Sequence, residues 1–148
     1  MEFKPPAGEV AWTFETGEGP LGKMTSGIET SPAIGGNGVV YVAANDGKFY
    51  AVAESSGEKI WEFDAGKPIN GAPALDENEV VFIASEKLYA IDGKTGTKLW
   101  ETGGEGDFSL AEYSTSPAIG SNGLLYVGYS GLGEENKLVA VDSKNGEP

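Results

Sequence analysis

The chain has 148 residues, 39% of them hydrophobic, which is the length of one ordinary domain with enough apolar side chains for a packed core. Its ten basic residues are all lysines and face 23 acidic residues, so the net charge of −13 disfavours binding to nucleic acid or to an anionic membrane. The absence of histidine, arginine and cysteine excludes the imidazole proton shuttle, the bidentate guanidinium, thiolate chemistry and disulfides. No apolar run is long enough for a transmembrane helix, and the first residues lack the hydrophobic core of a signal peptide.

A glycine four residues before a tryptophan occurs three times. The phrases are "GEVAWTF" from Gly8, "GEKIWEF" from Gly57 and "GTKLWET" from Gly96, and they contain the only three tryptophans, Trp12, Trp61 and Trp100. A residue type confined to one position of a recurring phrase indicates one structural role repeated along the chain. The repeat divides the chain into residues 8–56, 57–95 and 96–148.

Each unit has the same order of predicted strands. In the first unit, a tryptophan strand at residues 10–14 precedes a proline-containing strand at 31–34, an apolar strand at 39–44 and a closing strand at 48–54. Turn phrases such as "GGNG" separate the strands, and no helical pattern intervenes. The corresponding segments are 59–66, 72–75, 80–85 and 87–93 in the second unit, and 96–102, 116–119, 124–129 and 137–143 in the third. Four short strands per repeat predict an all-β fold of β-propeller blades.

The closing strand and the tryptophan phrase together resemble a known repeat. "AIDGKTGTKLW" follows the pattern Ala-x-Asp-x-x-Thr-Gly-x-x-x-Trp of the pyrroloquinoline-quinone-like (PQQ-like) β-propeller repeats. The copy before it has Ala53 and Ser56 in place of the aspartate and the threonine, and the copy after it has Asn145 in place of the threonine and ends before a tryptophan. The matching residues are Ala90, Asp92, Thr95, Gly96 and Trp100 in the best copy, Ala51, Gly57 and Trp61 in the copy before it, Ala140, Asp142 and Gly146 in the copy after it, and Gly8 and Trp12 at the start. The resemblance implies that each tryptophan packs between neighbouring blades, with its glycine making the turn into the outermost strand. A stacking platform for a sugar or base is the alternative.

The order of strands predicts an incomplete ring. Residues 10–14 form an outermost strand that precedes any complete blade, and the third blade, within residues 96–148, lacks its outermost strand. Three blades are too few to close a ring, since propellers have four to eight. We therefore expect either a homodimer, in which each N-terminal strand completes the partner's third blade to give six blades, or a segment of a longer propeller.

The resemblance raises two functions of different kinds. One is a noncatalytic scaffold that binds a protein or peptide, like the propeller of the outer-membrane β-barrel assembly machinery. The alternative is a fragment of a PQQ- and calcium-dependent alcohol dehydrogenase. Such quinoproteins use acidic and amide ligands for calcium, a basic group at the quinone and often adjacent cysteines. Because arginine and cysteine are absent, we expect no catalytic residue and neither PQQ nor calcium. The acidic turns at 44–48 and 76–79 do not match a dedicated calcium loop, so we expect polar hairpin turns there.

The longer connections indicate where a partner binds. In an up-and-down blade, the connection into the first strand and that between the second and third strands emerge on one face, and the insertions at 17–30, 102–115 and 130–136 all belong to these classes. Apolar residues within an acidic rim there predict a basic or neutral protein or peptide partner. The alternative is that these loops only pack among themselves over the central channel. The candidate binding residues are Met24, Ile28, Phe108, Leu110, Tyr113 and Leu132, rimmed by Glu18, Glu29, Glu105, Asp107, Glu112, Glu134 and Glu135. The resemblance implies a periplasmic or cell-envelope location, and the residues alone leave the compartment open.

Overall fold

The computed structural model of the chain describes residues 7–19, 27–69, 71–103, 112–130 and 136–148, and shows them as an all-β structure. No helix occurs in these ranges, so none that could cross a membrane is found there. In the described ranges twelve strands form three antiparallel sheets, as the prediction of three blades requires. The chain therefore has the fold class that its turn phrases and apolar runs predict.

The first two sheets have the same strand order. In both, a two-residue strand lies at one edge, two apolar strands follow, and the tryptophan strand lies at the other edge. The first sheet consists of β1 (Ala33–Ile34), β2 (Val39–Ala43), β3 (Lys48–Ala53) and β4 (Lys59–Asp64), and the second of β5 (Ala74–Leu75), β6 (Val80–Ala84), β7 (Leu88–Asp92) and β8 (Lys98–Thr102). The middle strands are rich in Val, Ile, Tyr and Phe, as strands buried on both faces require.

The third sheet has a divided first strand. β9 (Glu112–Tyr113) and β10 (Ala118–Ile119) both pair with β11 (Leu124–Ser130), on the side away from β12 (Lys137–Asp142). Among the described residues β12 pairs with β11 alone, whereas β3 and β7 each have a tryptophan strand as a second neighbour. No described strand pairs with the N-terminal tryptophan segment at residues 10–14, so this segment belongs to none of the three sheets.

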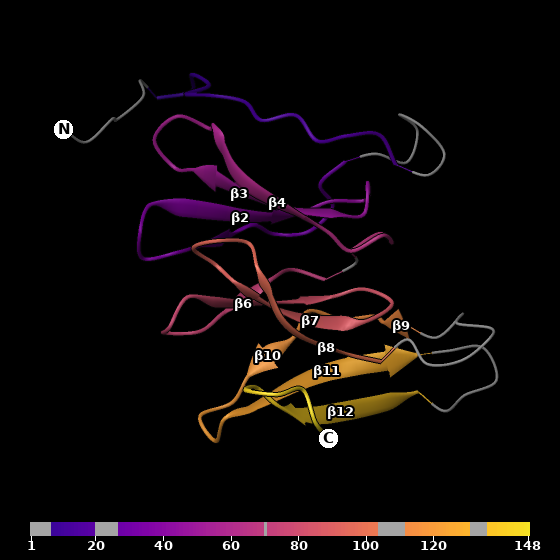
Figure 1. Cartoon of the computed structure of the whole chain (residues 1–148). Helices are drawn as coiled ribbons and strands as arrows, with labels where there is room; N and C mark the ends of the chain where they lie inside the picture. The colour runs from indigo at the N-terminus through magenta and orange to yellow at the C-terminus, as the bar shows by residue number, and fades with distance from the viewer. Residues whose placement is uncertain (1–6, 20–26, 70, 104–111, 131–135) are drawn as a thin grey trace.

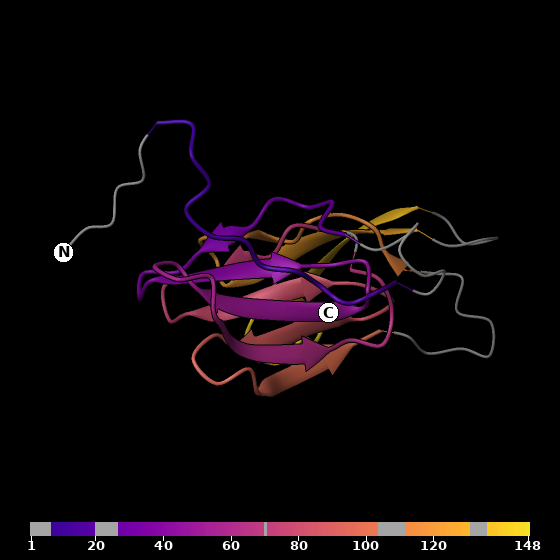
Figure 2. The same cartoon turned by 90° about the horizontal axis from the view of Figure 1, so that it is seen from above.

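The three sheets lie one below another, and the core lies between them (Figure 1). Side chains of the first and second sheets form one buried cluster around Tyr41, Phe49 and Ile83, and those of the second and third form another around Phe82 and Leu125. A third, smaller cluster joins Phe14 of the N-terminal segment to Val42 and Tyr50 of the first sheet. This segment runs along the outer face of the first sheet (Figures 1 and 2).

The turn before each outer-strand position is the same in all three repeats. Gly57, Gly96 and Gly146 have φ values of 73°, 75° and 73°, in the left-handed region that favours glycine. Each glycine N–H donates 2.8 Å to the carbonyl four residues earlier, on Ala53, Asp92 and Asp142. An added Cβ would lie 2.7 Å from the ring of Trp61 at Gly96 and 2.6 Å from that of Trp100 at Gly146. The glycines therefore serve both the turn and the close approach of an indole ring.

Gly96→Ala should destabilise the protein more than Gly66→Ala does. Both glycines have nearly the same φ, 75° and 76°, so each variant has the cost of a left-handed alanine, about 1–2 kcal/mol. A Cβ at Gly66 meets nothing within 4 Å, whereas at Gly96 it meets the Trp61 ring. We expect about 1–3 kcal/mol of additional loss for Gly96→Ala from overpacking, measured by urea unfolding. Equal losses would show that the close approach to Trp61 contributes nothing.

Candidate functional site

The three tryptophans make equivalent contacts with the repeat that follows each of them. Trp12 packs on Gly57, Trp61 on Gly96 and Trp100 on Gly146. Each indole Nε1–H donates to the carbonyl oxygen three residues before that glycine: 2.8 Å to Glu54, 3.0 Å to Gly93 and 3.1 Å to Ser143. We call this arrangement of indole ring, glycine and carbonyl the Trp joint. Trp61 thereby links the first sheet to the second, and Trp100 links the second to the third.

Aromatic neighbours extend the Trp joint into the core. The Trp61 ring lies 5.9 Å from the Tyr41 ring and 5.7 Å from the Phe49 ring. The Tyr41 hydroxyl donates to the Gly93 carbonyl at 3.0 Å, the same oxygen that accepts from Trp61. These contacts occupy the inner face of the indole, so the geometry is that of packing between sheets.

The turns between the second and third strands define one end of the sheets. We call it the loop end: the end where β2 joins β3, β6 joins β7 and β11 joins β12. There the Asn45 N–H donates to Gly27, the Tyr113 N–H donates to Ser85, and the Ser85 hydroxyl donates to Pro68. In the first and second sheets, the connection into the first strand therefore meets the connection between the second and third strands, and the Tyr113–Ser85 bond ties the start of the third sheet to the same end of the second.

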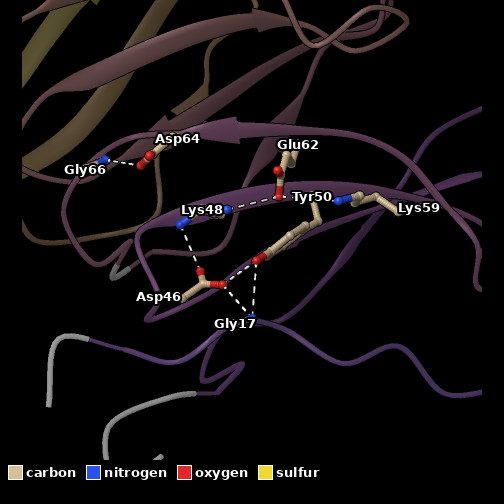
Figure 3. Close-up of polar contacts among 8 residues, drawn as sticks. All are labelled: Gly17, Asp46, Lys48, Tyr50, Lys59, Glu62, Asp64 and Gly66. Atoms are coloured by element: carbon tan, nitrogen blue, oxygen red, sulfur yellow. Dashed lines mark hydrogen bonds and ion pairs between the residues drawn. The ribbon is translucent and has the colours of Figure 1, made fainter. Parts of the chain in front are cut away.

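A polar cluster fixes the N-terminal segment at the loop end (Figure 3). Asp46 accepts hydrogen bonds from the Lys48 N–H at 2.9 Å, from the Gly17 N–H at 2.9 Å and from the Tyr50 hydroxyl. Burial, and then the hydrogen bond to Asp46, raise the pKa of Tyr50 well above its ordinary value. The Tyr50 ring also packs edge-on against Phe14, with centroids 5.1 Å apart. Sequence reasoning missed Asp46 and Tyr50, since one resembles an ordinary turn residue and the other an ordinary core residue.

A shallow hollow of about 580 Å³ lies beside this cluster. Its apolar side chains are Phe14 and Ile28, and its charged side chains are Glu15 and Glu18. Ile28 is 44% exposed, so its side chain is available at the surface of the hollow. The remaining lining residues are Thr16, Gly17 and Gly27. The hollow thus presents apolar surface between carboxylates, an arrangement suited to a side chain that is apolar along its stem and cationic at its tip.

The structure separates the sequence candidates for partner binding. Ile28 reaches solvent in the hollow, with Glu18 beside it. Tyr113 is only 6% exposed, because its ring packs into the core between the second and third sheets and lies 5.3 Å from the Tyr129 ring, so the structure buries this sequence candidate. Met24, Phe108, Leu110 and Leu132 lie outside the described residues, as do Glu105, Asp107, Glu134 and Glu135.

The two acidic turns use their carboxylates to close the backbone. Asp76 Oδ1 accepts from the N–H groups of Asn78 and Val80, both at 2.9 Å, and Asp46 accepts from Lys48 in the same way. No group of three or more His, Cys, Asp or Glu side chains in the described ranges is placed to hold a metal ion. In these two turns Asp46 and Asp76 are therefore engaged in closing the backbone.

Stacked four-stranded sheets with a tryptophan joint between successive repeats define the chain as a β-propeller protein. The model of one family, described as outer membrane protein assembly factor BamB, matches residues 2–148, and the chain belongs to this family of PQQ-like repeat proteins.

Known relatives include both enzymes and an assembly factor. The chain is 30% identical over 148 residues to the quinoprotein alcohol dehydrogenase PedH of Pseudomonas putida, covering 92% of this chain and 24% of PedH. The solved structure of quinohemoprotein alcohol dehydrogenase ADHIIG from P. putida HK5 matches with a TM-score of 0.78 at 23% identity, over 94% of this chain and 21% of that one. BamB from Moraxella catarrhalis matches with a TM-score of 0.55 at 21% identity, over 77% of this chain and 37% of that one. The chain therefore spans about a quarter of the length of the curated relative PedH.

Trp61→Ala should cost about 3–5 kcal/mol of unfolding free energy, because it removes an indole ring packed between two sheets and its hydrogen bond to Gly93. The neighbouring Ile60 side chain is 49% exposed, so Ile60→Ala is a matched control that should change stability by less than about 1 kcal/mol. Thermal or urea unfolding measures both. A Trp61→Ala protein that melts with the wild type would contradict the packing role.

Tyr50→Phe should change how stability depends on alkaline pH. The folded protein holds the Tyr50 proton more tightly than the unfolded chain, whose tyrosine pKa is 10.0. Above that pH the unfolded chain loses a proton that the folded protein retains, so wild-type stability falls as pH rises. The variant should be less stable at neutral pH, through loss of the bonds to Asp46 and Gly17, and should fall less steeply above pH 10.0. If the stability of wild type and of Tyr50→Phe fell equally with rising pH, burial and the hydrogen bond to Asp46 would not be raising the pKa of Tyr50.

Proposed function

We propose that the chain is a noncatalytic β-propeller scaffold that binds a basic protein or peptide at its loop end. The observation that carries this proposal is the hollow lined by exposed Ile28 and half-buried Phe14 together with Glu15 and Glu18. An apolar anchor within a charged rim is the usual anatomy of a protein–protein contact. The net charge of −13 would steer a cationic partner toward such a surface.

The construction of the hollow supports a binding role. Main-chain bonds and the Asp46–Tyr50–Gly17 cluster hold its walls against the first sheet, so a partner would meet a surface that is largely formed beforehand. The family description names an outer membrane assembly factor, and a cell-envelope location for this chain is part of the proposal.

The proposal is tested with a short synthetic peptide in which lysine alternates with leucine or phenylalanine, and with a counterpart in which glutamate replaces lysine. The lysine peptide should bind more tightly, weaken with added salt, and shift the backbone NMR signals of Gly17, Gly27 and Ile28. Ile28→Ser should weaken binding about tenfold, as expected for an anchor worth more than 1 kcal/mol, and Glu18→Gln should weaken it less.

The matched control is Ile60→Ser. Ile60 is about as exposed as Ile28 but lies at the start of β4, away from the loop end, so its substitution should leave peptide affinity unchanged. Equal affinity for the lysine and glutamate peptides, or signals that shift away from the hollow, would refute binding at this site.

A second candidate function follows from the 30% identity to PedH: a fragment of a quinone-dependent alcohol dehydrogenase. Adding pyrroloquinoline quinone with calcium and an alcohol, and following dye reduction, separates the two functions. Stoichiometric quinone binding with dye reduction would establish the enzyme fragment and overturn the noncatalytic proposal.

A further inference from the structure

The turn between β2 and β3 holds both walls of the hollow. One wall is the N-terminal segment, and the other begins at Gly27. The Asp46 carboxylate accepts a hydrogen bond from the Gly17 N–H at 2.9 Å, and the Asn45 N–H donates to the Gly27 carbonyl at 3.0 Å. Two neighbouring residues of one turn therefore set the separation of the two walls.

This turn is itself fixed to the connection that follows β4. The Gly47 carbonyl accepts from the Ala65 N–H at 2.9 Å. A Cβ added at Gly47 would lie 3.2 Å from the Lys67 main-chain nitrogen, so the turn packs closely on this connection. The walls of the hollow are thus held by a turn that is anchored between the first and second sheets.

The two carboxylate oxygens of Asp46 have different tasks (Figure 3). Oδ1 closes the turn by accepting from the Lys48 N–H at 2.9 Å. Oδ2 accepts from the Gly17 N–H and from the Tyr50 hydroxyl. A Cβ added at Gly17 would lie 3.1 Å from Oδ2, so the N-terminal segment lies directly against this oxygen. The link to the N-terminal wall therefore depends on Oδ2, and closure of the turn depends on Oδ1.

Polar contacts hold the N-terminal wall at Gly17. This residue is exposed and has no side chain, so burial does not fix its position. Its N–H has two acceptors, Asp46 and, at 3.4 Å, the Tyr50 hydroxyl. The next residue, Glu18, lines the hollow. The placement of that carboxylate opposite Ile28 therefore depends on the bond between Gly17 and Asp46.

We infer that Asp46 is a positioning residue for partner binding, which holds the hollow in its binding-competent form without touching the partner. The inference rests on the proposed function. Gly17 lines the hollow and Asp46 does not, so Asp46 acts through Gly17. If the wall detaches in a fraction of the molecules, the apparent affinity for a partner falls in proportion to the fraction that remains competent.

Asp46→Asn separates the two tasks of the carboxylate, because an amide has one acceptor oxygen in place of two. The variant can close the turn or accept from Gly17, but it cannot do both. The matched control is Asp76→Asn, which removes the same charge from the turn between β5 and β6. Asp76 makes both of its main-chain bonds through Oδ1, so an amide oxygen can keep them.

The first measurement is hydrogen exchange of the Gly17 amide in the free, full chain. Exchange should be about tenfold faster in Asp46→Asn than in wild type, as the loss of a hydrogen bond to a charged group implies. Asp76→Asn should leave Gly17 exchange unchanged. Equal Gly17 exchange in Asp46→Asn and wild type would overturn the inference without any use of a peptide.

The second measurement is the binding kinetics of the lysine peptide used to test the proposed function. Asp46→Asn should lower the association rate constant about tenfold and leave the dissociation rate constant unchanged, because the competent hollow is the same but rarer. Ile28→Ser removes a contact and should instead raise the dissociation rate constant. Asp76→Asn should show how much of any change in association comes from charge alone.

The outcomes distinguish the two proposals. An Asp46→Asn protein that associates as fast as Asp76→Asn, or that loses affinity through faster dissociation, would overturn the positioning role while leaving binding at the hollow intact. A wild-type protein that binds no lysine peptide would refute the proposed function, and with it the binding role of Asp46.

Discussion

The contact between an indole ring and a glycine without a side chain underlies the rest of this structure. The glycine is required twice, since its positive φ makes the turn and the missing Cβ leaves room for the ring. The indole contributes apolar area, and its N–H satisfies a carbonyl of the same turn. A single contact therefore sets both the path of the chain within one repeat and the position of the next repeat.

Within each sheet, the middle strands and the outer strands differ in how deeply they are buried. The middle strands are covered on both faces, β7 by the sheets on either side and β3 by the second sheet and the N-terminal segment, so both strands are almost wholly buried. The outer strands β4 and β8 carry both half-buried and exposed residues, and each places a glutamate between two lysines: Glu62 between Lys48 and Lys59, and Glu101 between Lys87 and Lys98. Hydrogen bonds from its two lysines lower the pKa of Glu101. Because these pairs are exposed, they contribute little to stability beyond keeping the rim of the sheets soluble.

The loop end has a different balance of forces. There the strands end and leave main-chain N–H groups without a partner strand, and a carboxylate in the turn accepts from them, as Asp46 does from Lys48 and Gly17. The excess of acidic residues remains at the surface. A rigid stack of sheets can carry variable connections at this end without loss of its core, which is why related propellers serve as enzymes and as an assembly factor.

Local chemistry makes much of the fold readable from the residues alone. The Gly-x-x-x-Trp phrase, the apolar runs and the turn residues identify the strands, their order and the repeat, because these features depend on neighbours within a few positions. The resemblance to PQQ-like repeats rests on the same short phrase. The absence of histidine, arginine and cysteine narrows the available chemistry by composition alone.

Burial is decided only by tertiary structure. The sequence predicts both Tyr113 and Ile28 as exposed binding residues, because each lies in a polar stretch. The side chain of Tyr113 is in the core, whereas that of Ile28 reaches solvent. Phe14 and Tyr50 meet although they belong to different strands of the repeat, and Asp46 acquires its role only when Gly17 is brought beside it. Such contacts join residues that are distant along the chain, and a repeated sequence assigns the same local pattern to each repeat. Whether a given copy is covered depends on its place in the stack, as the buried Leu88 and the exposed Leu138 show.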